Sequence, residues 1–333
     1  AGCGGGDKGT SEPPKPKPIA ADLKDLPNKD VKVGIKTFKL FTLKNNSNLH
    51  LQNTYSKGMR VAVVGRDMIY ANIKDRLVQM RWDKDGLRML DNNVDSMSGN
   101  AKISSDGTRG IFYTNKRMRL NYFDSETKRI EEAQGRFNNL VVIPKGNADK
   151  ALIWMNQGEM RKVDLRNGYR VGKDLGTVRK ESRSRDAADK DKINIPQSVV
   201  ADRNGDFYVG GNARIGTQDV GLVSVYDFNG KQKRVIGKEK REDSNAINSL
   251  TDIALTDEYL VVSDSSVDKQ QLQIYRKNTG TLVGTVSYKD LTDNKETSIG
   301  ACVNLANMPD NRVLVALSND RKNIKDEFFI LQL

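Results

Sequence analysis

One short pattern recurs six times along the chain and constrains its fold more than any other feature. In each copy an apolar run of strand type ends in Asn or Asp, and a polar turn follows. The copies end at Asn72, Asn115, Asn156, Asn212, Asp264 and Asn319. Asn and Asp tolerate left-handed backbone angles and bond their own main chain, which is typical of a turn that leaves a buried strand. The copies are 41 to 56 residues apart, and such a strand repeat predicts six blades of a β-propeller.

Tight turns indicate how the strands within a blade are connected. Five polar turns, each containing Asp or Asn, lie between strand-like runs at 83–86, 124–128, 164–168, 227–230 and 277–280. Asp and Asn start such turns, and Gly, where present, supplies the positive φ that they need. We interpret these five turns as links from the third to the fourth strand of five blades.

The sixth turn of this kind is absent, because the chain stops at residues 327–333. That last run fits the third strand of the last blade, and the alternating segment 31–43 fits its missing fourth strand. We therefore predict an all-β, six-bladed propeller of four-stranded antiparallel blades over residues 31–333, closed by its N-terminal strand. Closure removes a free sheet edge. A strand that starts at Val31 would start on the face of the third-to-fourth-strand turns.

The first 30 residues have a different composition from the rest. Five of the eight prolines lie between residues 13 and 27, after a Gly-rich start, and such a segment cannot bury a core. We predict a flexible tether over residues 1–30. Ala1-Gly2-Cys3 resembles the end of a bacterial lipobox, which implies removal of a signal peptide, acylation of Cys3 with chains such as palmitate, and a lipid-anchored envelope protein. Gly4 favours the outer membrane; the alternative is an exposed cysteine after a cloning scar.

Several blade starts share a further pattern. The segments 195–202, 249–256 and 299–305 are apolar first strands, and Asn204-Gly205-Asp206 follows the first of them. They resemble NHL repeats, whose blades run Pro-x-x-Val-Ala-Val-Asp-x-x-Gly, then a Tyr-Val-Ala-Asp strand and an Asp-x-x-Gly turn. The resemblance covers most of 58–333 and is best over 195–237 and 249–286. It implies a propeller without indicating a ligand. Cys302 in such a strand is expected to be a buried small hydrophobe.

The loops of one face are the predicted binding surface. Loops from second to third strands share that face with the connections between blades, and long connections are expected at 172–194, 237–248 and 287–298. Loops on a rigid scaffold are where binding residues concentrate. The candidate binding residues of this loop-rich face are Asn72, Asn115, Asn156, Asn212, Asp264, Asn319, Arg179, Lys180, Arg183 and Arg185.

Catalytic signals are sparse. His50 is the only histidine and no Gly-x-Ser-x-Gly elbow accompanies it, so we expect a histidine in an exposed loop in preference to a catalytic imidazole. Propeller lactonases hold a divalent metal on the axis, and Asn139, Asp202, Asp252 and Asn304 fall near inner strands. A calcium-type oxygen site is therefore conceivable; the alternative is polar groups hydrogen-bonded within the blades. A ring of carboxylates and amides would favour a hydrolase, and a channel of Val, Ala and Thr would favour binding.

The overall charge bears on the partner. The net charge of +12 and basic clusters such as 115–119 and 238–241 favour acidic partners, although solvated surface charges are the alternative. Aromatic stacking platforms are scarce, so nucleic acid is not expected. Two cysteines exclude a disulfide framework. We predict a non-catalytic envelope lipoprotein that binds a protein or an acidic glycan through its loop-rich face; the alternative is a metal-dependent lactonase or hydrolase at the axial channel.

Overall fold

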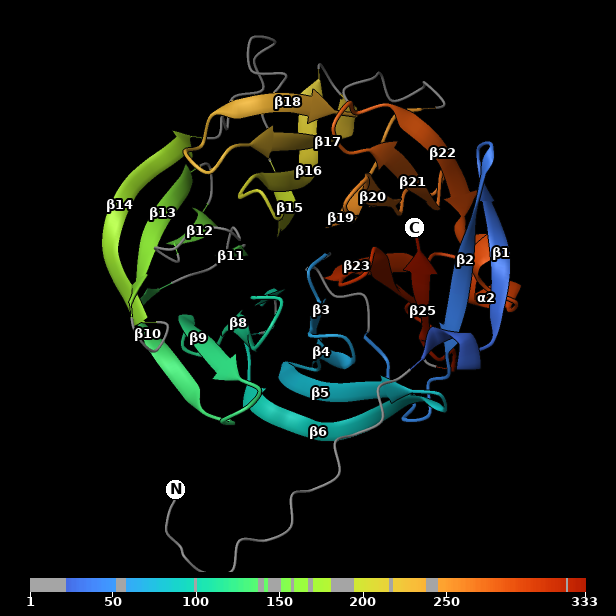
Figure 1. The fold of residues 1–333 in the computed structure, drawn as a ribbon, viewed down its shortest axis with the longest axis horizontal. Coiled ribbons are helices and arrows are strands. Elements are labelled where there is room, and N and C mark those ends of the chain that lie inside the picture. Colours follow the sequence, from blue (N-terminus) through green and yellow to red (C-terminus); the bar gives the residue numbers. More distant parts are fainter. Residues whose placement is uncertain are drawn as a thin grey trace, which may run out of the picture.

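The protein is a β-propeller. The computed structural model describes residues 22–51, 58–98, 101–136, 141–142, 151–156, 159–166, 170–180, 195–215, 218–237, 245–321 and 323–333. Their strands form five four-stranded antiparallel sheets and one five-stranded sheet, arranged as blades around a central axis (Figure 1). The prediction that every blade has four strands is wrong for the blade that contains both ends of the described chain.

The blades follow one another along the chain, with the first strand of each nearest the axis (Figure 1). The five four-stranded blades are β3 (Val61–Val64), β4 (Met68–Ile73), β5 (Arg76–Asp83) and β6 (Gly86–Ser96); β7 (Ile103–Ser105), β8 (Gly110–Thr114), β9 (Arg119–Asp124) and β10 (Ile130–Arg136); β11 (Val141–Val142), β12 (Ala151–Asn156), β13 (Glu159–Arg166) and β14 (Arg170–Lys180); β15 (Ile195–Ala201), β16 (Phe207–Ile215), β17 (Gln218–Tyr226) and β18 (Gln232–Ile236); and β19 (Leu250–Leu255), β20 (Tyr259–Asp264), β21 (Gln271–Arg276) and β22 (Leu282–Ser287).

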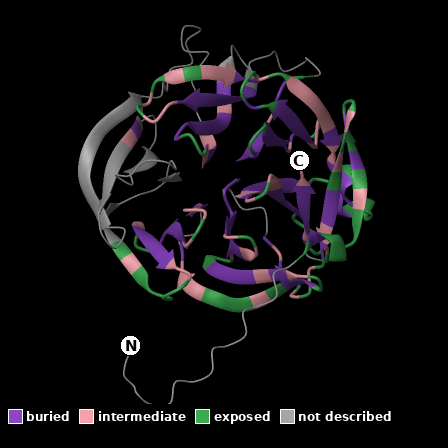
Figure 2. Cartoon of the chain, in the orientation of Figure 1, coloured by how far each residue is buried: buried purple, intermediate pink, exposed green. Residues whose placement is uncertain are grey.

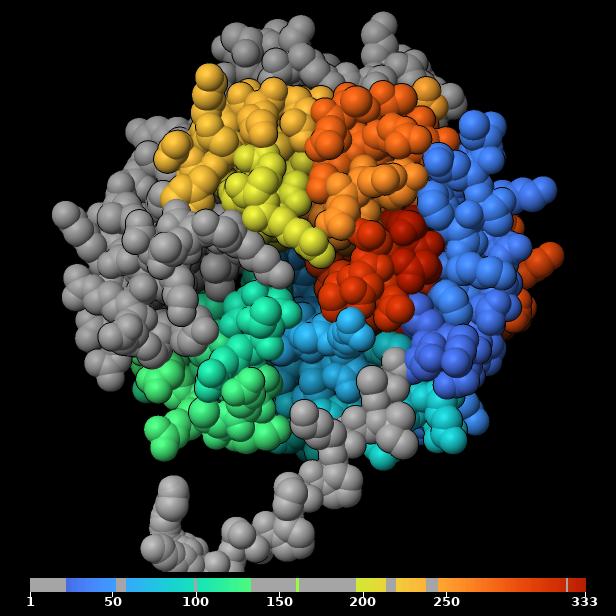
Figure 3. All heavy atoms as spheres, viewed as in Figure 1, coloured from blue at the N-terminus to red at the C-terminus, as the bar shows by residue number. Residues whose placement is uncertain are grey.

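The five-stranded blade joins the N-terminal and C-terminal parts of the described chain. Its strands are β23 (Cys302–Met308), β24 (Arg312–Ser318), β25 (Glu327–Gln332), β2 (Lys36–Leu43) and β1 (Asn28–Val33). The predicted pairing of the N-terminal segment with the last strand is present, because β2 pairs antiparallel with β25. Figure 3 shows this N-terminal segment in blue beside the red C-terminal sheet.

The segment 31–43 is a hairpin and not the single strand that its alternation predicts. Gly34 has φ +62, which allows the chain to reverse so that Val33 pairs with Lys36. The first half of this hairpin, β1, is thus a fifth strand at the outer edge of the blade, beside β2. The alternating pattern continues through Gly34 and Ile35, so alternation alone does not reveal the turn.

This hairpin reverses the expected direction of chain entry. Loops from second to third strands and connections between blades lie on one face, which we call the crossing face; the other turns lie on the opposite face, which we call the turn face. The hairpin tip lies on the turn face, so β1 begins on the crossing face. There Lys29 lies 3.5 Å from Asp293 in the connection before β23. The chain therefore enters on the crossing face, and the prediction that it enters on the opposite face is wrong.

The core lies between neighbouring blades. Inner strands are buried along their whole length, as in β19 and β20, because each blade is covered on both faces by its neighbours. Outer strands such as β6 are largely exposed (Figure 2). Leu23 and Leu26, 6% and 3% exposed, pack in the cluster between β2 and β3. The packed part of the chain thus begins before residue 31, the boundary that the sequence suggested.

The connections between blades also differ from expectation. Residues 172–180 belong to β14 and not to a long connection. The connection 287–298 contains two short helices, α1 (Tyr288–Leu291) and α2 (Lys295–Ser298). A 3-10 turn, η1 (Leu23–Asp25), precedes β1. Cys302 is buried, as predicted. Within the described residues, no helix has both the length and the apolar character that crossing a membrane requires.

Candidate functional site

Four of the Asn and Asp residues predicted as binding groups of the crossing face are buried, and their side chains bond the main chain: Asn72, Asn115, Asp264 and Asn319. The Asn72 side chain donates a hydrogen bond to the Ala101 carbonyl at 2.8 Å. The Asn319 side chain donates to the Thr297 carbonyl at 3.1 Å. Each bond connects the end of a second strand to the connection that precedes an inner strand. These two side chains therefore hold the blades together, and neither presents a free surface group.

Two further members of this set act in the same way. Both carboxylate oxygens of Asp264, which is fully buried, accept main-chain N–H groups, from Asn248 at 2.7 Å and Ser249 at 3.1 Å. The Oδ1 atom of Asn212 accepts the N–H of Leu250 at 3.2 Å. Both side chains thus fix the start of β19.

The remaining crossing-face candidates are only partly described. Asn115 is buried and its Oδ1 accepts the main-chain N–H of Arg117 at 2.9 Å. Asn156 ends β12, and Arg179 and Lys180 end β14, where Lys180 pairs with Glu159. The side chains of these three, and residues Cys3, Asn139, Arg183 and Arg185, lie outside the described part of the chain.

A cavity of about 200 Å³ lies on the axis and opens on the turn face. Its walls come from five inner strands, β3, β7, β15, β19 and β23. Many of the wall residues are small or aliphatic: Val61, Ala62, Val63, Ile103, Val199, Val200, Ala201, Ile253, Leu255, Leu305 and Ala306. The lining also contains polar residues, among them four Asp, Arg203, Asn307 and Asn311, so it is neither the apolar channel nor the ring of carboxylates and amides that the sequence analysis set against each other.

A carboxyl group lies at the inner end of the cavity. Asp252 is 1% exposed, and its Oδ2 accepts the main-chain N–H groups of Met59 at 3.1 Å and Leu305 at 2.8 Å. Burial raises the pKa of Asp252; the Ser198 hydroxyl, these two amides and the charge of Lys102 oppose that effect. The carboxyl thus joins the inner strands β19 and β23 to the connection before β3.

The connection before β3 closes the cavity on the crossing-face side. At Gly58, with φ +83, a Cβ atom would lie 2.3 Å from the Thr251 carbonyl oxygen, so only glycine fits there. The Lys102 ammonium donates to the carbonyls of Gly58 at 3.0 Å and Gln197 at 2.8 Å. Burial lowers the pKa of Lys102 to about 8, although the charge of Asp252 opposes this effect.

The residues proposed from sequence as metal ligands do not form a cation site in the described structure. The oxygens of Asp252 face N–H donors, and Asp202 is bound to the Lys277 ammonium. Asn304 is 2% exposed, on β23. Within the described residues, no three His, Cys, Asp or Glu side chains are grouped so as to hold a metal ion. The arrangement at Asp252 suits a structural carboxyl and does not suit a ligand to calcium.

The mouth of the cavity carries an Asp whose hydrogen-bonding capacity is fully used. Asp106 Oδ1 accepts the main-chain N–H groups of Thr108, Arg109 and Gly110 at 2.7 to 2.9 Å. Its Oδ2 accepts the Tyr122 hydroxyl at 2.6 Å. Asp106 therefore shapes the turn between β7 and β8.

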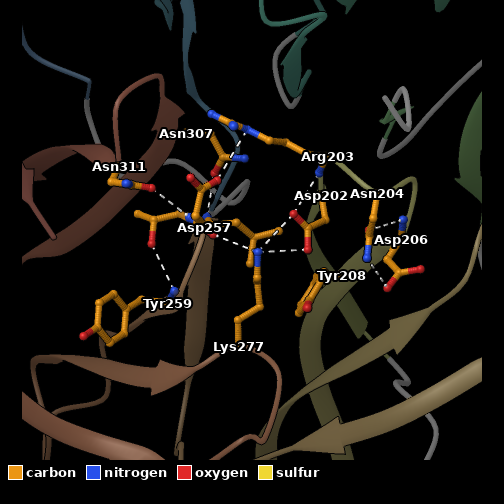
Figure 4. A network of polar contacts seen from close by, with 12 residues as sticks. Asp202, Arg203, Asn204, Asp206, Tyr208, Asp257, Tyr259, Lys277, Asn307 and Asn311 are labelled. Carbon is orange, nitrogen blue, oxygen red and sulfur yellow. Dashed lines mark hydrogen bonds and ion pairs between the residues drawn. The ribbon is translucent and has the colours of Figure 1, made fainter. Parts of the chain in front are cut away.

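A buried ion pair joins two blades beside the mouth. Lys277 points toward Asp202 (Figure 4), and its ammonium lies 3.1 and 3.0 Å from the two carboxylate oxygens. It also donates to the Thr256 carbonyl at 3.0 Å. The side chains of Lys277 and Asp202 are 6% and 11% exposed. Removal of one partner would leave the other charge buried and unpaired, which is costly.

Exposed polar groups complete the mouth. Arg203 Nε lies 3.4 Å from an Asp257 oxygen, and these side chains are 71% and 49% exposed. The Asp257 main-chain N–H donates to Asn311 Oδ1 at 3.0 Å, and Leu255 N–H donates to Asn307 Oδ1 at 2.7 Å. Figure 4 shows these side chains around the mouth. They connect the turns of three neighbouring blades.

Sequence reasoning missed most of this mouth. Lys277 is the first residue of a turn that was correctly identified, yet its side chain bonds a different blade. Arg203, Asp257 and Asn311 lie in first-to-second-strand turns, and their Asp and Asn content was the available signal. Their approach to one another depends on the order of blades around the axis, which no local pattern shows.

His50 has a structural environment that the sequence did not indicate. Its Nδ1 lies 3.0 Å from Asp326, and its side chain is 18% exposed, so the expectation of an exposed loop histidine is wrong. Asp326 also accepts the Leu51 N–H. Burial raises the pKa of Asp326 to about 6, an effect opposed by the Leu51 amide and by His50. These contacts fasten the segment after β2 to the loop between β24 and β25.

Comparisons with known proteins support the fold alone. The chain is similar to the WD40 β-propeller domain of Doa1, with a TM-score of 0.51 and 14% identity over 86% of this chain and 95% of that one. It also matches a chain of the mitotic checkpoint complex, with a TM-score of 0.48 and 12% identity over 91% of this chain and 84% of that one. No protein-family model and no curated protein sequence matches it.

Proposed function

We propose that the protein is a non-catalytic lipoprotein of the cell envelope that binds an acidic partner, a protein or a polysaccharide, through its crossing face. The observation that carries the non-catalytic part is the axial cavity. Many of its wall residues are small or aliphatic, and three of the four carboxylates in its lining, Asp106, Asp202 and Asp252, are held by structural hydrogen bonds. The fourth, Asp257, is exposed at the mouth beside Arg203. A general acid or base needs a group that can reach substrate, and the other three are already engaged.

The anchor is Cys3, in the proposed lipobox, and the outer membrane is the proposed location. Residues 4–21 lie between Cys3 and the first described residue and could extend to roughly 60 Å. Because the chain enters on the crossing face, this face can turn toward the membrane, and we infer a partner at the membrane surface. The basic residues Arg179, Lys180, Arg183 and Arg185 are the proposed contacts. The blades are proposed to be of the NHL type.

Two variants, each of which loses four positive charges, test whether the partner binds the crossing face. One replaces Arg179, Lys180, Arg183 and Arg185 with Gln, and the control replaces Lys36, Lys84, Arg129 and Lys231 of the turn face with Gln. Cross-linked partners recovered from native membranes, and binding to polygalacturonate at several salt concentrations, are measured for both. We expect the first variant to lose salt-sensitive binding and the control to retain it. The reverse result, or equal binding by both, would assign the partner elsewhere.

The anchor is tested separately. The Cys3→Ala precursor should be released from bacterial membranes, and mass spectrometry of the unaltered protein should find acyl chains on Cys3. An unmodified Cys3 thiol would show that the lipoprotein assignment is wrong without bearing on the cavity.

A further inference from the structure

The mouth of the axial cavity holds two opposite charges that are weakly paired. Arg203 and Asp257 are separated by 3.4 Å, and both are substantially exposed. Ion pairs of this kind contribute little to stability, because water screens them. Each charge is therefore available to a ligand. The other two carboxylates of the mouth differ, since Asp106 accepts four donors and Asp202 binds Lys277.

Two side-chain amides add hydrogen-bond donors next to this pair. The Oδ1 atoms of Asn307 and Asn311 are occupied by the main-chain N–H groups of Leu255 and Asp257. Among the described residues, none accepts a hydrogen bond from the two side-chain nitrogens. With the Arg203 guanidinium, these nitrogens form a set of donors that suits a carboxylate, and the Asp257 carboxylate beside them suits an ammonium group.

The size and walls of the cavity restrict the ligand further. A volume of about 200 Å³ is below the range of about 300–1,000 Å³ in which drug-sized ligands bind. The aliphatic wall below the mouth, including Val63, Ile103 and Leu255, matches a short apolar group. A small molecule with a positive charge, a negative charge and one aliphatic branch satisfies all three conditions.

We propose that the axial cavity binds a free α-amino acid with an aliphatic side chain, such as leucine or valine. Arg203 and the amides of Asn307 and Asn311 bind its carboxylate, Asp257 binds its ammonium group, and the side chain lies against the cavity wall. The ligand replaces the weak contact between Arg203 and Asp257 with two charge-assisted contacts. This inference does not depend on the anchor or on the crossing-face partner.

Isothermal titration calorimetry with leucine tests the proposal. Arg203→Gln and Asp257→Asn should each weaken binding by about tenfold or more, with an unchanged melting temperature. The matched control is Arg66→Gln, because Arg66 pairs with Asp310 at 3.3 Å on the same face but does not line the cavity. Leucine binding should be unaffected in this control.

Two analogues of leucine, each lacking one of its two charges, test whether the site binds both charges. Leucinamide lacks the carboxylate and 4-methylpentanoate lacks the ammonium group, and both should bind at least about tenfold more weakly than leucine. Equal binding of 4-methylpentanoate would assign a simple alkyl carboxylate and overturn the proposal. The absence of binding of leucine, valine and isoleucine at millimolar concentration would overturn it as well.

Discussion

At the residue scale, the same chemistry that made the Asn and Asp residues visible in the sequence also removes them from the surface. A side chain that bonds the main chain at the end of a strand is a good turn former. The polar side-chain atoms of Asp264 and Asn319 are bonded to main-chain groups in this way, so they are not available to a partner. At the opposite end of the axis, Arg203, Asp257 and the side-chain nitrogens of Asn307 and Asn311 keep hydrogen-bonding capacity that a ligand can use.

Asp326→Asn should change how stability depends on pH. The pKa of Asp326 is raised from 3.8 to about 6, so the folded state holds the proton more tightly than the unfolded state. Its contribution is fully present below pH 3.8 and is lost as pH rises through 6. Between pH 4 and 7 the free energy of unfolding of the unaltered protein should therefore fall by about 2 kcal/mol relative to the variant.

Urea denaturation at pH 4, 5, 6 and 7 measures this difference. Because other carboxyl groups titrate in both proteins, the difference between the two curves reports Asp326 together with its contact to His50. A difference that stays constant over this range, or that changes in the opposite direction, would contradict the assignment.

At the element scale, the added hairpin decides both the strand count of the last blade and the face at which the chain enters. The tip of this hairpin rests against the neighbouring blade. Gly34 lies so close to β22 that a Cβ atom would be 2.2 Å from the Val283 carbonyl oxygen. Val31 and Val33 of β1 pack in the cluster between the two blades. The hairpin thus covers the contact between the last two blades.

Gly34→Ala should destabilise the protein much more than Gly65→Ala. Both glycines have φ near +62, so each alanine carries the left-handed cost of about 1–2 kcal/mol. At Gly65 no atom lies within 4 Å of the added Cβ, so no other cost is expected. At Gly34 the clash with Val283 must move the hairpin, and the total should reach roughly 3–4 kcal/mol.

Chemical denaturation of the two variants gives this comparison directly. The Gly65→Ala variant serves as the control for backbone conformation, so the excess at Gly34 reports the close approach. Equal destabilisation would show that the hairpin tip does not rest on β22.

At the scale of the whole molecule, the ring is held by pairing of β2 with β25 and by polar contacts on the axis. The main-chain bonds of β2 and β25 join residues 39–43 to residues 328–332. Lys102 and Asp252 connect inner strands from opposite sides of the axis. The ring therefore depends on contacts between residues that are hundreds of positions apart.

Two truncations should distinguish the contribution of β1 to stability from the contribution of β2 to ring closure. A form that starts at Asp22 is the reference. A form that starts at Lys36 lacks β1 and the buried Leu23, Leu26, Val31 and Val33, and should lose roughly 5 kcal/mol of stability while the ring remains closed. A form that starts at Lys44 also lacks β2 and exposes the edge of β25, so it should aggregate or lose cooperative unfolding. Calorimetry and light scattering measure both outcomes; identical melting of the two shorter forms would contradict closure by β2.

The sequence by itself determined the local events of this fold. The Asn and Asp residues marked the ends of five second strands, whereas β16 continues beyond Asn212 to Ile215; five polar turns marked the third-to-fourth-strand links, and the apolar run at residues 327–333 marked the last strand. These features depend on backbone preferences and on alternation over a few residues, which are local properties. The reversal at Gly34 escaped detection because a glycine within an alternating run does not distinguish a bend from a turn.

Only the tertiary structure decided the site. Lys277 meets Asp202 across 75 positions of sequence, and Asp257 meets Asn311 across 54, because the blades return their turns to one axis at one face. The same geometry buried the side chains of Asn72, Asn115, Asp264 and Asn319 on the crossing face and left the cavity open on the turn face. Contacts of this kind depend on the closure of the ring, and closure is a property of the whole chain that no segment of the sequence contains.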